Sequence, residues 1–250
     1  MHSDFLMHYG IPGMKWGVRR FQEKGSSKRT PAGKKRYAHV KTEPTEEDIQ
    51  KKRIKTSSSF ARKIYQKAAR VEPRITKAVV SAVTGAGAKM YGLKNRLKTH
   101  ASLTRKINTD SEQKGISIEQ AAEQIRDSIR YTSLSNDADY TENYFAVKDS
   151  LEKQGYTETR CRNYFDLYDQ GKAKHKQITS VYADKHGNQF EIQFQTPSSI
   201  KAKEEKTPIY EEIRKTGISK SQKTVLEKKM DKIASRVKSP TGVYTIKSHG

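Results

Sequence analysis

The sequence has one cysteine, one tryptophan and no long apolar run. With Cys161 as the single cysteine among 250 residues, an internal disulfide framework and cysteine-based zinc sites are excluded, which indicates a reducing compartment. No stretch approaches the roughly 20 apolar residues of a membrane span, and His2, Asp4 and His8 interrupt the N-terminus, so we expect no membrane partner and no signal peptide. We expect the protein to remain in the compartment in which it is synthesised, or to be carried as part of a larger assembly.

Acidic residues are also scarce. The chain has 28 of them against 50 lysines and arginines, a net charge of +22, which points to polyanionic partners such as nucleotides, nucleic acid or an acidic protein surface. The first 90 residues hold 21 of the basic residues but only 7 of the acidic ones. A hydrophobic content of 33% supports one modest core of roughly 100 to 150 residues plus polar extensions.

The first 20 residues carry the single tryptophan, far from any hydrophobic run. An aromatic anchor between glycines, with basic residues at the rim, is typical of a segment that docks into a groove on another protein. Packing of the tryptophan on its own domain is the alternative. The residues of this docking segment are Lys15, Trp16, Arg19 and Arg20.

Residues 21–56 are polar, contain Pro31 and Pro44, and are too poor in apolar residues to form a core, which predicts a flexible linker. Apolar residues at helical spacing then predict two helices over 57–70 and 73–84, the second starting at Pro73. The polar faces of both are almost wholly basic. They are either solvated faces or a nucleic-acid surface.

Residues 85–240 alternate between strand and helix patterns and form the expected domain, followed by a tail over 241–250. A capping box of Ser117 and Gln120 opens a helix, and Gly155 ends another. The fold class is therefore α+β (α/β-like), with a mixed central sheet of about five strands flanked by helices. Strands are expected at 90–93, 128–134, 156–164, 175–183 and 188–196, and helices at 117–126, 140–154, 198–214 and 219–236.

The last expected strand alternates strictly between apolar and polar residues. Phe190, Ile192 and Phe194 fall on one face, and the other face carries Glu191 among glutamines. A carboxylate at the centre of a polar strand face is typical of the wall of a wet cleft. An ordinary solvent-exposed strand face is the alternative.

Separated charged residues form a candidate nucleotide site. A basic and hydroxyl-bearing cluster can hold a polyphosphate, and two carboxylates, Asp127 and Glu191, can hold the Mg²⁺ that accompanies it. A solvated helix face is the alternative for the basic cluster. Its members are Arg96, Lys98, Ser102, Arg105 and Lys106.

Three stretches of this region resemble the synthetase domain of the RelA/SpoT family of pyrophosphate-transferring nucleotidyltransferases. Residues 96–107 (RLKTHASLTRKI) are similar to the family's Arg-x-Lys-x-x-x-Ser-x-x-x-Lys stretch. Residues 125–132 (IRDSIRYT) resemble its metal-binding strand, with Asp127 followed by Arg130 at a shorter spacing than usual. Residues 187–196 (GNQFEIQFQT) resemble its Gly-x-x-Val-Glu-Ile-Gln-Ile-Arg-Thr strand and place Glu191 at the essential glutamate.

The resemblance implies transfer of the β,γ-pyrophosphate of ATP to a ribose 3′-hydroxyl of GDP or GTP, or in toxin-like branches of another nucleotide or tRNA. It implies that Asp127 and Glu191 bind Mg²⁺, with Glu191 also helping to deprotonate the attacking hydroxyl. Phosphate contacts would come from Arg96, Lys98, Ser102, Arg105, Lys106 and Arg130.

The chain also departs from the family pattern. His175 stands where the family has the tyrosine that stacks on the acceptor base, and Thr179 stands where it has a histidine. Gln195 replaces an arginine that binds phosphate, and no metal-binding His-Asp hydrolase domain precedes the fold. We therefore expect a small synthetase-only relative with altered or lost acceptor specificity.

The N-terminal run His8-Tyr9-Gly10, Gly13-Met14-Lys15-Trp16-Gly17 and Arg19-Arg20 resembles a short tag on proteins encoded among structural genes of phages of Gram-positive bacteria. This resemblance implies a phage or prophage protein, located in the bacterial cytoplasm or in the virion, that binds a phage structural protein through residues 8–20. Three functions stay open: an enzyme, a virion protein with a degenerate synthetase-like fold, and a basic nucleic-acid binder.

Overall fold

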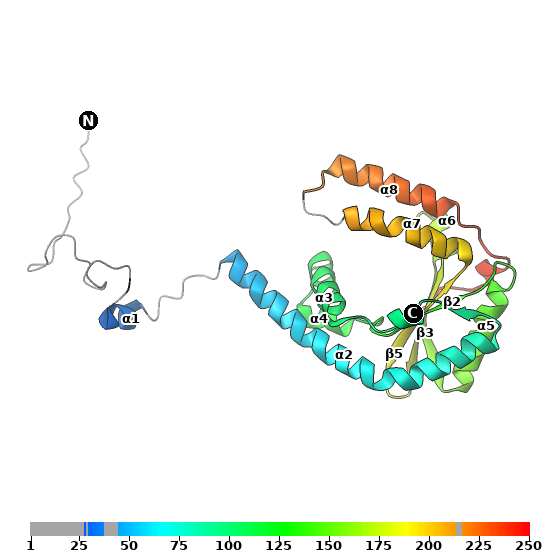
Figure 1. Ribbon diagram of the computed structural model, residues 1–250, viewed down its shortest axis with the longest axis horizontal. Helices are drawn as coiled ribbons and strands as arrows, with labels where there is room; N and C mark the ends of the chain where they lie inside the picture. Colours follow the sequence, from blue (N-terminus) through cyan, green and yellow to red (C-terminus); the bar gives the residue numbers. More distant parts are fainter. Residues whose placement is uncertain (1–27, 29, 38–44, 214–216) are drawn as a thin grey trace, which may run out of the picture. The chain divides into compact units, whose positions relative to one another are not determined.

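A computed structural model describes residues 28, 30–37, 45–213 and 217–250 of the chain (Figure 1). The chain divides into two compact units, Met1–Lys52 and Arg53–Gly250. In the first unit the described residues form helix α1 (Pro31–Tyr37) and the first turns of α2 (Glu46–Gly85). The docking segment defined above lies outside the described residues.

Helix α2 starts earlier than the sequence predicts. Thr45 and Asp48 form reciprocal hydrogen bonds: the Thr45 hydroxyl and amide donate to Asp48 Oδ2 at 2.7 and 3.2 Å, and the Asp48 amide donates to Thr45 Oγ1 at 3.2 Å. This is a capping box, and the acidic residues of the first turn also suit the positive end of the helix dipole. The prediction of a linker over 21–56 is therefore wrong for residues 31–37 and 46–56, which are helical.

The two helices predicted at 57–70 and 73–84 are one helix, because α2 continues through Pro73. A proline inside a helix removes one backbone hydrogen bond, which tertiary packing must offset. Here the apolar stripe of α2 stays buried on both sides of the proline, with Ala68 before it and Ile75, Val79 and Val83 after it. Residues 68–83 consequently contribute to the main core of the second unit.

The central sheet is mixed and has five strands, as predicted, and their order is β1-β2-β5-β4-β3. Strands β2 and β5 are parallel, and the remaining pairs are antiparallel. The first strand is shorter than expected, because residues Leu93–Asn95 form a 3-10 helix (η1). The strands are β1 (Lys89–Met90), β2 (Arg130–Leu134), β3 (Tyr156–Asn163), β4 (Ile178–Asp184) and β5 (Gln189–Gln195).

Helices cover both faces of the sheet (Figure 1). The C-terminal half of α2 and helix α5 (Tyr140–Lys153) form the main core with the apolar face, where Phe190, Ile192 and Phe194 are fully buried, as their alternation predicts. Helices α7 (Pro197–Ile213) and α8 (Lys220–Ser235) lie over the opposite face. The chain also forms α6 (Tyr164–Asp169) and a second 3-10 helix, η2 (Val243–Thr245).

A smaller core joins helices α3 (His100–Lys114) and α4 (Ile118–Glu123) to α2. The predicted capping box of Ser117 and Gln120 starts α4, which ends three residues before the predicted Arg126. Asp127 therefore lies in the connection that leads into β2, and not at a helix end. No helix in the described ranges is both long and apolar enough to cross a membrane.

Candidate functional site

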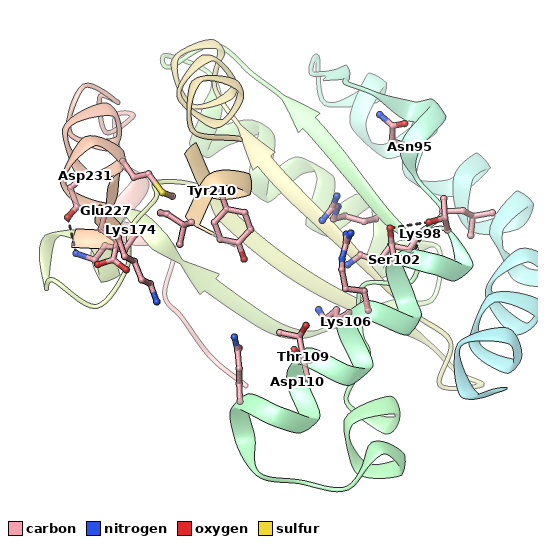
Figure 2. Close-up of a pocket in the computed structure, with 18 of the residues that line it drawn as sticks. Asn95, Lys98, Ser102, Lys106, Thr109, Asp110, Lys174, Tyr210, Glu227 and Asp231 are labelled. Carbon is pink, nitrogen blue, oxygen red and sulfur yellow. Dashed lines mark hydrogen bonds and ion pairs between the residues drawn. The ribbon is translucent and has the colours of Figure 1, made fainter. Parts of the chain in front are cut away.

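A cavity of about 1190 Å³ opens beside the start of β2 (Figure 2). One side consists of Lys94, Asn95, Leu97, Lys98 and Thr99, the polar face of α3 and Arg130. The other side comes from α7 and α8, with Tyr210, Lys223, Glu227 and Asp231 among its residues. The cavity therefore lies between elements that are far apart in the sequence, since α3 ends at Lys114 and α7 begins at Pro197.

Helix α3 is amphipathic, and its polar face is directed toward the cavity. Thr99 caps the helix by accepting a hydrogen bond from the Ser102 amide at 3.2 Å. Leu103 and Ile107 are fully buried on the opposite face and fix the rotation of the helix. The cavity face then consists of Ser102, Arg105, Lys106, Thr109, Asp110 and Gln113.

Asp127 is held by two lysines at the edge of this cavity. Lys98 Nζ donates to Asp127 Oδ2, and Lys106 Nζ donates to Oδ1 at 2.9 Å. Burial by itself would raise the pKa of Asp127, but the charges and hydrogen bonds of Lys98 and Lys106 outweigh it and leave that pKa below its ordinary value. Burial lowers the pKa of Lys98, although Asp127 opposes this effect. These three groups form one coupled charge cluster.

Glu191 joins this cluster through the sheet. Arg130 of β2 and Glu191 of β5 are paired residues in the parallel ladder, and Gln193 Nε2 donates to Glu191 Oε1 at 2.9 Å. Burial raises the pKa of Glu191, and the negative charge of Asp127 raises it further, while Arg130 opposes the shift. The two carboxylates are therefore electrostatic neighbours although 64 positions separate them in the sequence.

Lys203 of α7 is a member of this cluster that the sequence did not reveal. Its ammonium group donates to Gln193 Oε1 at 3.0 Å, which connects α7 to the polar face of β5. Burial lowers the pKa of Lys203, and the nearby charge of Arg130 adds to this effect, while Glu191 opposes it. Lys203 lies near Glu191 only because α7 packs over the sheet. The spacing of residues along the chain therefore could not predict that Lys203 belongs to the cluster.

The backbone around Arg96 and Lys98 runs beside the start of β2. The Arg130 amide donates to the Arg96 carbonyl at 2.7 Å, and the Lys98 amide donates to the Ser128 carbonyl at 3.0 Å. The Arg96 guanidinium, however, binds Glu72 of α2 and does not line the cavity. Of the predicted phosphate contacts, the cavity brings together Lys98, Ser102, Arg105, Lys106 and Arg130, but not Arg96.

The residues that depart from the family pattern also lie outside the cavity lining. The His175 ring packs against Tyr164, with 4.2 Å between ring centroids, and burial together with Lys206 and Lys203 lowers the pKa of His175 to about 4. Gln195 is buried and binds the side chains of Gln177 and Ser199. His175 and Gln195 therefore serve packing and sheet structure here, whereas Lys174 faces the cavity and pairs with Asp231 at 3.1 Å.

The far wall contains further residues that sequence reasoning missed. Tyr210 is half exposed and is the aromatic member of the lining, and Figure 2 shows its ring pointing into the cavity. Helices over 198–214 and 219–236 are predicted, but their rotation over the sheet is not, so the residues of this wall could not be selected from the sequence.

The two carboxylates fit a magnesium ion chemically. Mg²⁺ prefers oxygen ligands and is typically held by one or two carboxylates together with substrate phosphates, which the cavity's cations can position. Asp127 raises the pKa of Glu191, so the two negative charges repel each other. A divalent cation held by Asp127 and Glu191 would relieve this repulsion.

Comparison with known proteins gives one family match and several structural similarities. Residues 2–23 match a family of unknown function (DUF7211). Among curated proteins, none matches the chain significantly.

The solved structures similar to this chain include the small alarmone synthetases 1 and 2 of Bacillus subtilis. Synthetase 1 has 18% sequence identity and a TM-score of 0.45, and the match covers 69% of this chain and 87% of that one. Synthetase 2 has 14% identity and a TM-score of 0.45, over 70% of this chain and 91% of that one. A GTP pyrophosphokinase family protein of Streptococcus pneumoniae has 14% identity and a TM-score of 0.43, over 68% and 88%. At these values the likeness assigns no activity.

Proposed function

We propose that this chain is an Mg²⁺-dependent pyrophosphotransferase of the RelA/SpoT type. It would move the β,γ-pyrophosphate of ATP to a ribose 3′-hydroxyl of a nucleotide or tRNA. The observation that carries this proposal is that both carboxylates lie against cations of the cavity lining: Asp127 pairs with Lys98 and Lys106, and Glu191 lies opposite Arg130. Two carboxylates next to a cluster of cations are the groups that phosphoryl transfer requires. This arrangement favours a phosphate-binding site over the alternative that the basic cluster is only a solvated helix face.

The cations would bind the ATP phosphates. Arg105 and Arg130 are planar donors suited to bidentate phosphate contacts, and Lys98 and Lys106 supply compact positive charges. In the structure both lysines bind Asp127. Incoming phosphates would compete with Asp127 for these lysines, and the released carboxylate oxygens would become available to a metal ion.

Glu191 would act as the general base. The acceptor 3′-oxygen attacks the β-phosphorus of ATP, the bond between that phosphorus and the oxygen bridging to the α-phosphorus breaks, and AMP leaves. The hydroxyl proton passes to the Glu191 carboxylate and then to solvent. The raised pKa of Glu191 makes it a stronger base than an exposed glutamate. Bound Mg²⁺, held by Asp127 and Glu191, would supply positive charge that stabilises the transferring group.

The test is product formation by the purified full chain with labelled ATP, Mg²⁺ and a panel of GDP, GTP, AMP and tRNA. We expect AMP and a pyrophosphorylated acceptor in equal amounts. Glu191→Gln should reduce the rate at least about 100-fold, which is the low end of general-base contributions. Asp127→Asn should also abolish turnover, and Glu123→Gln, an exposed glutamate at the end of α4, is the matched control. Absence of product with every acceptor, or full activity of a folded Glu191→Gln protein, contradicts the proposal.

A further inference from the structure

Three side chains that commonly bind metal ions converge away from the cavity, on β3 and the C-terminal residues. Glu158, Cys161 and His249 each offer one ligand atom, and these atoms lie within 4.8 Å of one another. Glu158 Oε2 and His249 Nε2 are 3.6 Å apart. Glu158 and Cys161 are buried, and the His249 side chain is 45% exposed, so the cluster opens to solvent on the histidine side.

A β-bulge brings the first two residues to the same face of the sheet. Residues three apart on a regular strand point to opposite faces. The register of β3 against β4 shifts between Glu158 and Arg160, so Glu158 pairs with Tyr182 and Cys161 pairs with Ser180. Paired residues of an antiparallel ladder share a face, and bulges commonly redirect side chains in this way. The extra residue in β3 is therefore what makes this cluster possible.

The third residue is held in place through the backbone. Cys161 and His249 exchange two hydrogen bonds, from the Cys161 amide to the His249 carbonyl at 3.0 Å and from the His249 amide to the Cys161 carbonyl at 2.9 Å. Arg162 also donates to the carbonyls of His249 and Gly250, at 3.1 and 2.6 Å. A β-carbon on Gly250 would lie 2.4 Å from the Thr159 carbonyl oxygen, so glycine permits this close approach to the bulge.

The surroundings of the cluster are buried and polar. The hydroxyls of Ser180 and Tyr182, both on this face of β4, are buried beside Cys161 and Glu158. The Tyr144 hydroxyl lies 2.9 Å from Glu158 Oε1 and 3.5 Å from Cys161 Sγ. Groups that hydrogen-bond to metal ligands orient those ligands, and these three hydroxyls are placed to do so for Glu158 and Cys161.

We propose that Glu158, Cys161 and His249 bind a divalent transition-metal ion of the zinc class. Carboxylate oxygen, thiolate sulfur and imidazole nitrogen are the ligands that Zn²⁺ takes, whereas Mg²⁺ and Ca²⁺ select oxygen alone. Three protein ligands leave a fourth position for water. On binding, the Cys161 thiol loses its proton to solvent and the thiolate forms the bond to the metal. The ion would fasten the C-terminal residues to the edge strand β3.

Lys148 is the competitor for this site. Its ammonium group pairs with Glu158 Oε2 at 3.1 Å and also lies 4.0 Å from Glu152 Oε1, one turn further along α5. The Lys148 side chain is partly exposed, so it can move to Glu152 when a cation takes its place on Glu158. Metal and Lys148 therefore exclude each other at Glu158, which predicts that removing the ammonium group tightens metal binding.

The experiment is a Co²⁺ titration of the reduced, chelator-treated full chain, followed by absorption, with Zn²⁺ added afterwards. We expect one equivalent to produce a thiolate-to-cobalt charge-transfer band that Zn²⁺ bleaches, and a Tm that rises with Zn²⁺. Cys161→Ser should lose the band, His249→Ala should weaken binding, and Lys148→Met should strengthen it. His186→Ala, at an exposed histidine in the β4–β5 turn, is the matched control.

Two outcomes would overturn the proposal. One is a cobalt spectrum of the natural sequence without the charge-transfer band, which would place any bound cobalt on other residues. The other is a band of equal affinity in the natural sequence and in both His249→Ala and Lys148→Met. Since neither readout involves nucleotide turnover, the result is independent of the proposed enzyme activity.

Discussion

Arg130 and Glu191 lie directly opposite each other in the parallel pairing of β2 and β5. The charge of Arg130 lowers the pKa of Glu191, while burial and Asp127 raise it, and the net shift is upward. A cavity cation, the Asp127 carboxylate and the candidate base are therefore coupled at one point of the sheet. Four predictions test this site and the structure around it.

The decrease of kcat/KM at acidic pH should report the pKa of Glu191. The carboxylate form accepts the proton, so activity should fall as the pH drops through the Glu191 pKa, which lies above its ordinary value. Replacing Arg130 with Met removes an opposing positive charge, and the acid limb should move to higher pH. The measurement is kcat/KM against pH for both proteins. A limb at an ordinary glutamate pKa, or one that does not move, would count against Glu191 as the base.

Arg105 and Arg96 should behave differently although both belong to the basic motif. Arg105 lines the cavity, so Arg105→Ala should weaken ATP binding roughly tenfold, measured calorimetrically. Arg96 binds the buried Glu72, so Arg96→Ala should leave ATP affinity unchanged and lower the free energy of unfolding by about 2 kcal/mol. Arg126→Ala, an exposed arginine absent from the cavity lining, is the control. Equal losses of ATP affinity in all three variants would contradict the assigned geometry.

Asp184 should stabilise the hairpin between β4 and β5 in a pH-dependent manner. Its carboxylate accepts hydrogen bonds from the amides of His186 and Asn188, each at 2.9 Å, and pairs with Arg74. Burial opposes ionisation, but the bonds from Asn188, Arg74 and His186 outweigh it and hold the Asp184 pKa far below its usual range. We expect Asp184→Asn to cost about 1 to 3 kcal/mol of unfolding free energy at pH 7.

The sign of the pH effect follows from that lowered pKa. The ionic contribution is complete above the unfolded pKa, roughly 4, and is lost as the pH falls towards the folded pKa. The difference between the natural protein and Asp184→Asn should therefore shrink below about pH 4. Denaturant unfolding across this range measures it, with Asp149→Asn, an exposed site on α5, as the control. A constant difference at all pH values would exclude the ionic origin.

Tyr210 should contribute to acceptor binding in the proposed reaction. It supplies an aromatic face to the cavity, and a nucleobase stacked on such a ring gains about 1 to 3 kcal/mol. Tyr210→Leu should raise the KM of the acceptor roughly tenfold and leave ATP affinity unchanged. Tyr65→Leu, at an exposed tyrosine of α2, is the matched control. A loss confined to ATP binding would assign Tyr210 to the donor side of the cavity.

Local sequence patterns determined most of the secondary structure. The alternation of Phe190, Ile192 and Phe194 and the capping box of Ser117 depend on neighbours within a few residues, and the structure confirms both. The prediction of a helix boundary at Pro73 is wrong. Proline usually disrupts a helix, but burial of apolar residues on both sides of Pro73 keeps α2 continuous. The start of α2 was missed because the Thr45 and Asp48 capping box lies in a stretch whose composition resembles a linker.

The sequence by itself determined the residue types of the candidate site: a basic motif over 96–106 and two carboxylates at 127 and 191. Only the tertiary structure decided which of them meet. Parallel pairing of β2 with β5 puts Glu191 beside Arg130. The position of α7 brings Lys203 to the polar face of β5 and Tyr210 to the cavity. The ion pair with Glu72 keeps the Arg96 guanidinium out of the cavity lining. Spacing along a chain specifies neighbours on one helix or strand, but contacts between elements depend on packing and electrostatics that no local pattern encodes.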